Sequence, residues 1–328
     1  MNVVMTLGDR GRVKCSHDIT GIKVNGEPML TWRDSVCALL GELFPRLESS
    51  VSPDGRAQGG EEIPPLRSCE IEESMARLRS RKSPGWDGMT GEMCKAIWQT
   101  IPSHVQCLFE YCFRKGYFPA FWKTTRVVVL LKSPEKDKSS PQSYRAISLL
   151  PAFGKVLERI MVQRLGVKTS HLTSDRQYGF RTGRSTDDAL MHVKNLVVRC
   201  PSKYVFGIFV DFKGAFDYLS WSSVLSKIRE CDCWELALWK SYFHGRKAFV
   251  QGVNERVWVN VERGCPQGSI AGPFIWNLMM DELLGELSSV ASVALVLSSS
   301  SRLPNTCASL TRGPLKSVSR SQRRRPSG

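Results

Sequence analysis

The cysteines of this 328-residue chain form no recognisable metal or disulfide pattern. There are eleven of them, an odd number, and no C-x-x-C pair occurs. Cys231 and Cys233 lie two residues apart, which is not the spacing of a zinc site. We therefore expect buried, reduced thiols and a reducing compartment.

Long apolar segments are also missing. No run of eighteen apolar residues occurs, and the N-terminal residues lack the apolar core of a secretory signal. These absences predict a protein that neither enters a membrane nor is secreted. We expect it in the nucleus or the cytoplasm.

Acidic residues are absent after Glu286. Residues 288–328 contain twelve serines and seven basic residues, and this composition predicts either disorder or translation in a wrong frame. The net charge of the whole chain is +15, so the residues before this tail carry +8, which is 15 minus 7. A basic chain of this size indicates a polyanionic partner, nucleic acid before membrane.

The order of periodic segments predicts an α+β fold. Residues 1–69 are expected to form a poorly ordered leader and linker, in which Asn25-Gly26 is compatible with a short hairpin. From residue 70 onward strands and helices are mixed, without the regular alternation of a doubly wound sheet. Apolar stripes at helical spacing begin at Ile71, Val105, Phe153, Leu190 and Trp221.

Strands are predicted where β-branched apolar runs are short. They cover Val127–Leu131, Val205–Val210 and a hairpin of 248–250 with 257–261. A helix should follow Pro273 and run over 274–287.

Asp211 is the first candidate for chemistry, because it follows the buried strand Val205–Val210. A carboxylate on such a rigid support can face a cleft and hold Mg²⁺, which prefers oxygen ligands. Two-metal nucleotidyl transfer needs at least two acidic residues from different elements. The simpler interpretation of a lone aspartate here is a helix cap or a turn.

Two further segments could line a nucleotide site. The loop Arg263–Pro273 is rich in glycine, which permits close backbone approach to a ligand, and Gln267 within it can hydrogen-bond a base or sugar. In Ser143–Leu150, Arg145 sits where a strand could project its guanidinium toward phosphate oxygens. Taken singly, these are also an ordinary turn and a surface arginine.

Taken together and in this order, the segments resemble the reverse transcriptases of non-LTR (LINE-type) retrotransposons. The likeness is greatest to arthropod elements that insert at ribosomal DNA sites, and it covers residues 70–287. Its blocks are Ser83-Pro-Gly-Trp-Asp-Gly88, Phe118-Pro119, Trp122-Lys123, Tyr144-Arg-Ala-Ile-Ser-Leu149, Gln177–Thr186, the Asp211 segment and the Gly264–Gly272 loop. Ala146 replaces the family's usual proline. The resemblance implies right-hand polymerase fingers over 70–203 and a partial palm over 204–287.

The resemblance also implies roles for single residues. Asp211 would be the first catalytic, Mg²⁺-binding aspartate, and the backbone carbonyl of Phe212 would be a further metal ligand. Phe216 would exclude a ribose 2′-OH by steric clash, although core packing is its simpler role. Asp217 is expected to be structural or capping.

The remaining implied roles concern substrate and nucleic acid. Arg145 and Lys132 would hold the triphosphate of a dNTP, and Gln267 with Gly268 would line the nucleotide pocket. Element RNA as template and a DNA primer are the implied partners. The basic cluster Arg77–Lys82, and Arg181 with Arg184, could follow RNA or could be solvated surface.

The chain departs from the family after the helix at 274–287. A hairpin carrying two adjacent aspartates should follow, but residues 288–299 hold no acidic side chain. We expect this chain, with no thumb and no endonuclease, not to polymerise DNA. The alternatives are a catalytically dead remnant that still binds nucleic acid, or an unstable pseudogene product. The Asp211 segment alone does not separate this family from the group II intron maturases.

Overall fold

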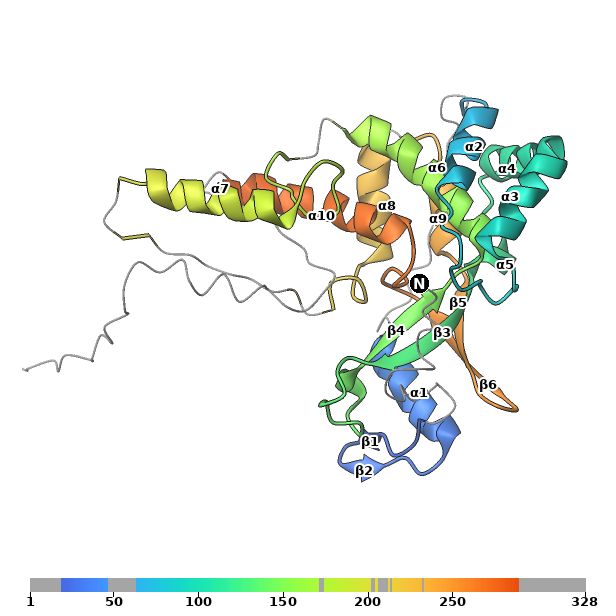
Figure 1. Cartoon of the computed structure of the whole chain (residues 1–328), viewed down its shortest axis with the longest axis vertical. Coiled ribbons are helices and arrows are strands. Elements are labelled where there is room, and N and C mark those ends of the chain that lie inside the picture. Colours follow the sequence, from blue (N-terminus) through green and yellow to red (C-terminus); the bar gives the residue numbers. More distant parts are fainter. Residues whose placement is uncertain are drawn as a thin grey trace, which may run out of the picture. The chain divides into compact units, whose positions relative to one another are not determined.

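The computed structural model describes residues 19–46, 63–170, 174–201, 204–205, 212, 214–231 and 233–288 (Figure 1). By the contacts among its residues the chain divides into two units, one of 1–173 with 209–283 and one of 174–208 with 284–328. The mixture of helices and strands confirms the α+β prediction. The fingers–palm boundary at 203/204 stays a prediction.

A four-stranded sheet lies at the centre of the first unit. Its strands are β3 (Thr124–Leu131), β4 (Tyr144–Leu149), β5 (Arg246–Gln251) and β6 (Arg256–Val261), in the order β4-β3-β5-β6. β3 pairs antiparallel with β4 and parallel with β5, and β5 pairs antiparallel with β6. The strand at Val127–Leu131 and the later hairpin are thus confirmed, whereas Val205–Val210 lies, apart from Val205, outside the described residues.

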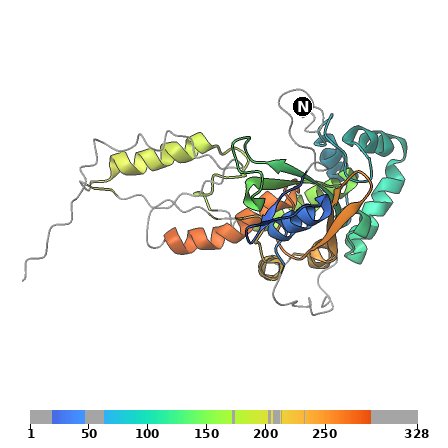
Figure 2. The same ribbon diagram turned by 90° about the horizontal axis from the view of Figure 1, so that it is seen from below.

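The segment 19–46 corrects the expectation of a poorly ordered leader. β1 (Lys23–Val24) and β2 (Glu27–Pro28) form the expected hairpin, in which Asn25 and Gly26 take positive φ angles of 52° and 89°. The helix α1 (Trp32–Leu43) then lies across the strands (Figures 1 and 2).

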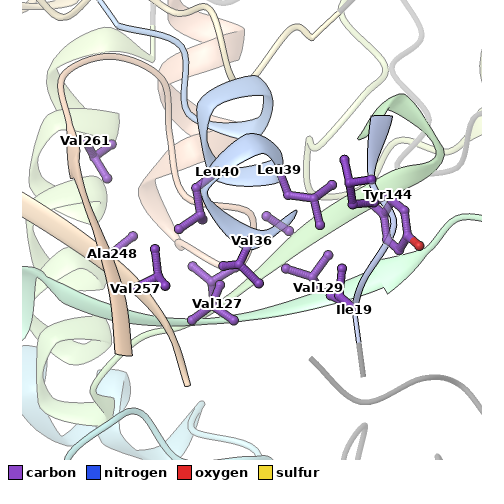
Figure 3. Packing of buried hydrophobic residues seen from close by; sticks show 13 residues of the cluster. Ile19, Val36, Leu39, Leu40, Val127, Val129, Tyr144, Ala248, Val257 and Val261 are labelled. Atoms are coloured by element: carbon purple, nitrogen blue, oxygen red, sulfur yellow. The ribbon is translucent and has the colours of Figure 1, made fainter. Parts of the chain in front are cut away.

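One face of α1 forms the core with one face of the sheet (Figure 3). Val36, Leu39 and Leu40 are at most 2% exposed. They pack with sheet residues at alternating positions, namely Val127, Val129, Tyr144, Ala146, Ala248, Val250, Val257 and Val261. This burial explains why the segment is ordered: without α1 that face of the sheet would meet water.

Leu39→Ala is expected to lower the free energy of unfolding by about 2–5 kcal/mol, because it removes a fully buried side chain and leaves a cavity. Leu30→Ala is the matched control, since Leu30 lies nearby in sequence and is 83% exposed. Its effect should stay within about 0.5 kcal/mol. Urea unfolding of both variants measures the difference. Equal effects would contradict the packing of α1.

Helices form the rest of the first unit's core. They are α2 (Ser68–Ala76), α3 (Gly91–Thr100), α4 (Pro102–Lys115), α5 (Ala120–Lys123), α6 (Ala152–Thr169), α8 (Trp221–Glu230) and α9 (Leu236–Phe243). The predicted stripes at Ile71 and Phe153 are buried, as is that at Val105 except for Leu108, which is 43% exposed. A 3₁₀ turn, Pro141–Ser143, precedes β4.

The second unit contains α7 (Thr186–Arg199) and the loop before it. Ser185 caps α7, accepting a hydrogen bond from the backbone N–H of Asp188. In the loop, the carboxylate of Asp175 pairs with Arg181 and Arg184 at 3.6 and 3.2 Å.

α10 (Ala271–Ser288) contains the helix expected over 274–287. Among the helices of the described residues, none is long and apolar enough to cross a membrane.

Candidate functional site

The glycine-rich loop after β6 is held between two segments far away in sequence. The backbone N–H groups of Gly264 and Cys265 donate to the carbonyl oxygens of Leu219 and Phe216, at 2.8 and 2.7 Å. On the other side, the N–H of Ser148 in β4 donates to the Gln267 carbonyl at 2.8 Å. The fold therefore brings together the loop, the turn that follows Asp211, and the strand that carries Arg145.

Two glycines of this loop permit that close approach. Gly264 has φ +77°, and a Cβ there would lie 2.6 Å from the Asp217 carbonyl oxygen. Gly268 has φ +127°, and a Cβ there would lie 2.5 Å from the Ser148 carbonyl oxygen. The glycines thus serve contact with the protein's own backbone, in addition to any ligand.

Gly264→Ala is expected to destabilise the fold more than Gly21→Ala. The two positions have nearly the same φ, +77° and +75°, but only Gly264 has neighbours within 4 Å of an added Cβ. Gly21→Ala should cost about 1–2 kcal/mol for its backbone conformation. Gly264→Ala should cost about 1–3 kcal/mol more for the clash. Melting temperatures of both variants test this. Equal losses of melting temperature would show that the loop shifts at no cost to accept the added Cβ.

A buried polar network fixes the start of α10. Glu158 of α6 is 2% exposed, and its Oε2 accepts from the Ser269 hydroxyl at 3.1 Å and from the Ile270 N–H at 2.8 Å. Ser269 Oγ in turn accepts from the N–H groups of Ala271 and Gly272. It also lies 3.1 Å from the Tyr242 hydroxyl. Together with the Ser148 bond, these contacts fix both ends of the segment Gln267–Ile270.

The sequence interpretation missed Glu158. A signal was present, because this carboxylate interrupts the buried stripe Val156, Leu157, Ile160, Met161. A charge within such a stripe needs a polar partner. That the partner comes from a loop 111 residues away follows only from the tertiary structure.

Asp217 lines the same pocket as Gln267. Burial raises the pKa of the Asp217 carboxyl, although the nearby Gln267 amide and the Lys132 charge favour its ionised form. Asp217 does not cap α8, because Ser220 occupies that position. Its expected structural role therefore takes the form of a contact with the predicted nucleotide loop.

The aromatic residues after Asp211 surround one tryptophan. The rings of Phe212 and Phe216 lie 5.7 and 5.9 Å from Trp276 of α10, measured between ring centroids. Both phenylalanines are half-buried. Phe216 thus has the packing role that the sequence left open, and its partial exposure is compatible with contact to a sugar. The steric role stays a prediction.

Lys132 and Arg145 lie at the same end of the β3–β4 pair. Leu130 pairs with Arg145 and Leu131 with Tyr144, so Lys132 follows directly. Arg145 is exposed, on the sheet face opposite α1. Lys132 Nζ donates to the Gln142 carbonyl at 2.9 Å and lies close enough to Asp217 to favour its ionised form. Lys132 and Gln267 therefore both lie near Asp217.

The Mg²⁺ prediction depends on Asp211, which lies outside the described residues. Within the described ranges there is no group of three or more His, Cys, Asp or Glu side chains that could hold a metal ion. Asp217, the carboxyl beside the loop, has a pKa that is raised by burial. The described side chains alone therefore do not fit Mg²⁺.

A narrow pocket lies beside Asp217 and Gln267. It is also lined by Ala146 and Ser148 of β4 and by Leu43 and Phe44 at the end of α1. Its water-accessible space is about 20 Å³, which is room for about one water molecule. A nucleotide does not fit there, so a substrate would have to bind on the open Arg145 face or after the loop moves.

Comparisons with known proteins extend these observations. Residues 134–298 match the family model for reverse transcriptase (RNA-dependent DNA polymerase). The chain is 51% identical over 280 residues to the putative 115 kDa protein in type-1 retrotransposable element R1DM of Drosophila melanogaster, covering 85% of this chain and 27% of that protein.

Two further relatives carry similar names. The Pol polyprotein from type-1 retrotransposable element R1 of Bradysia coprophila is 44% identical, over 84% of this chain and 28% of that protein. A probable RNA-directed DNA polymerase from transposon X-element of Drosophila melanogaster is 30% identical, over 67% and 25%. The chain therefore spans little more than a quarter of these relatives. It is a member of the reverse transcriptase family, of the kind found in arthropod R1 non-LTR retrotransposons.

Proposed function

We propose that this chain is the part of a retrotransposon reverse transcriptase that binds template, primer and incoming dNTP. The observation that supports this most is the meeting of four predicted nucleotide-site segments in the first unit. The Gln267 loop is joined by backbone hydrogen bonds to Ser148 of β4 and to Phe216 of the turn after Asp211. Lys132 lies near Asp217 of the same turn.

Each of these side chains has a proposed task. Arg145 and Lys132 would bind the triphosphate, since guanidinium and ammonium groups suit phosphate oxygens. Phe216 would exclude the ribose 2′-OH, and Gln267 would orient the nucleotide beside Gly268. By the family resemblance, Asp211 and the Phe212 carbonyl would be the ligands of Mg²⁺, which prefers such oxygen atoms.

The proposed partners are element RNA as template and a nicked DNA primer. Arg181 and Arg184 of the second unit are candidates for RNA contact, although both already pair with Asp175. Such substrates occur inside the cell, so the nucleus or cytoplasm is the proposed location.

We further propose that this chain binds these substrates without joining nucleotides. Two-metal transfer needs carboxylates from at least two elements. Residues 288–299, where the family's paired aspartates are expected, contain no Asp or Glu. Asp211 alone would not hold both metal ions in catalytic geometry.

Binding of a fluorescent oligo(dT) primer on poly(rA) tests the proposal. Anisotropy should show binding that weakens steeply with salt, and dTTP should strengthen it. Arg145→Ala should reduce the apparent dTTP affinity about tenfold, the loss of one charge-assisted phosphate contact. Arg126→Ala is the matched control, because Arg126 is exposed on the same face at the other end of β3. No dTTP effect, or equal losses in both variants, would refute the proposed role.

A further inference from the structure

The face of the central sheet opposite α1 is basic. α1 packs on one face through alternating strand residues (Figure 3), so the side chains between those positions point to the other face. The four strands contain no Asp or Glu. Each strand contributes one exposed cation to this second face, which we call the open face, and these are Arg126, Arg145, Lys247 and Arg256.

The strand register spaces these charges across the open face. Lys247 lies opposite Thr124, and Arg126 lies two residues further along the same strand. Arg145 lies opposite Leu130, four residues beyond Arg126. At about 3.3 Å per residue along a strand and about 4.8 Å between strands, neighbouring cations are about 8–14 Å apart. Long, flexible side chains can adjust these distances, so the charges can follow the phosphates of one extended strand.

The charges of the open face are not compensated by carboxylates. None of the ion pairs among the described residues includes these four cations. Glu255, in the turn between β5 and β6, binds Arg33 of α1 at 2.6 Å. Arg256 Nε donates to Gln251 Oε1 at 2.6 Å, and this acceptor is neutral. An exposed surface with charges of one sign attracts polyanions.

An exposed tryptophan lies among these charges. Trp258 of β6 is in one row with Phe249 of β5 and Arg126 of β3. Its ring lies 4.6 Å from that of Phe249, yet Trp258 is 49% exposed whereas Phe249 is 2% exposed. An aliphatic side chain would be enough to cover Phe249. An exposed ring beside cations is typical of surfaces that bind single strands, because bases stack on the ring while phosphates contact the cations.

We propose that the open face binds single-stranded RNA, with a base stacked on Trp258 and phosphates bound by Arg126, Lys247 and Arg256. Arg145 lies on the same face, so the strand would continue from the proposed dNTP site. The choice of RNA rests on the proposed function, in which the template that is not yet copied is single-stranded. A duplex hides the faces of its bases, so stacking on Trp258 requires a single strand.

The anisotropy of a fluorescent oligo(rA), without primer or dTTP, measures this binding by the full chain. Trp258→Leu keeps an apolar side chain over Phe249 and should weaken binding about tenfold, through the loss of one stacked base. Trp258→Phe keeps a ring and should stay within about threefold of the unmodified chain. Tyr111→Leu is the matched control, because Tyr111 is 47% exposed and lies on α4, outside the open face. It should not change the affinity.

Lys247→Ala separates phosphate contact from stacking. The slope of log affinity against log salt concentration should become shallower by about 0.7, the value for one phosphate contact with a single strand. Trp258→Leu should leave this slope unchanged. Lys115→Ala is the control, since Lys115 is an exposed lysine on α4. The apparent dTTP affinity of the formed primer–template complex should stay unchanged in these variants, as in Arg126→Ala.

The outcomes separate the two proposals. Unchanged oligo(rA) binding in Trp258→Leu would overturn the role of the open face, and the proposed function would stand if dTTP still strengthens the poly(rA)·oligo(dT) complex. An equal loss in Trp258→Leu on a blunt oligo(rA)·oligo(dT) duplex would also overturn it, because no base face is exposed there. If dTTP has no effect but Trp258→Leu loses oligo(rA) binding, the proposed function fails and the open face stands as an RNA-binding surface.

Discussion

Arg164→Met should lower the free energy of unfolding by about 3–5 kcal/mol, because it leaves buried carboxylates without their cation. Arg164 of α6 is 10% exposed and binds Glu70 of α2 with two hydrogen bonds of 2.8 and 3.0 Å. It also reaches Glu235 at 3.4 Å, and Glu235 is 2% exposed. The guanidinium further donates to the carbonyl oxygens of Pro64 and Pro65 and lies over the Phe113 ring.

Arg33→Met is the control for this prediction. Arg33 and Glu255 form a shorter contact of 2.6 Å, but their side chains are 61% and 41% exposed. An exposed pair of this kind contributes about 0–1 kcal/mol. Urea unfolding of the two variants should therefore show a large loss for Arg164 and a small one for Arg33. Similar losses would mean that the Arg164 cluster is solvated in the folded protein.

Lys123→Met should raise the free energy of unfolding at pH 7, by about 1–3 kcal/mol. Burial, with a smaller effect of Arg246, lowers the pKa of Lys123 from 10.5 to about 8. That difference corresponds to about 3 kcal/mol of unfavourable interaction for the charged amine. Loss of the 2.9 Å hydrogen bond from Lys123 Nζ to the Ser241 carbonyl offsets about 1 kcal/mol of the gain.

The gain should shrink as the pH rises. Between the folded pKa of about 8 and the unfolded value of 10.5, the unfolded chain binds more protons at Lys123, so this contribution to stability increases with pH. The advantage of Lys123→Met over the unmodified chain should fall by about 1.4 kcal/mol between pH 7 and 9. Urea unfolding at both pH values measures it.

Buried cysteines have the opposite effect, because they make the free energy of unfolding of both proteins fall as the pH rises. Burial raises the pKa of Cys94 to about 11 and that of Cys112 to about 12, so their thiols ionise first in the unfolded chain as pH rises. Their contribution is the same in both proteins and cancels in the difference. A pH-independent difference would show that Lys123 is not desolvated in the fold.

Local patterns predicted the elements whose burial follows from their own sequence. The stripe beginning at Phe153 has one apolar helical face, and Val127–Leu131 is a continuous apolar run. These local patterns are enough to predict a buried helix and a buried strand. The helix at 32–43 has apolar side chains at Val36, Leu39 and Leu40, the same kind of spacing. The sequence analysis does not predict this helix, because the Gly- and Pro-rich segment that follows it has the composition of a linker.

The long-range contacts of the site could not be read from local patterns. Asp217 and Gln267 are fifty residues apart, and Arg164 and Glu70 are 94 apart. Pairing of such side chains depends on how helices and loops pack, which no local spacing encodes. The family's motif order predicts that Arg145, Phe216 and Gln267 belong to one site, and this stays a prediction. The structure adds the Glu158–Ser269 network and the backbone hydrogen bond from Ser148 to Gln267, which fix this loop.

The most direct test of the account is primer extension by the full chain on poly(rA)·oligo(dT) with labelled dTTP and Mg²⁺, at concentrations where anisotropy shows the complex to be formed. We expect dTTP to strengthen the complex and no labelled nucleotide to be incorporated. Incorporation by the unmodified chain that Asp211→Ala abolishes would contradict it, because a single aspartate segment would then be enough for polymerisation.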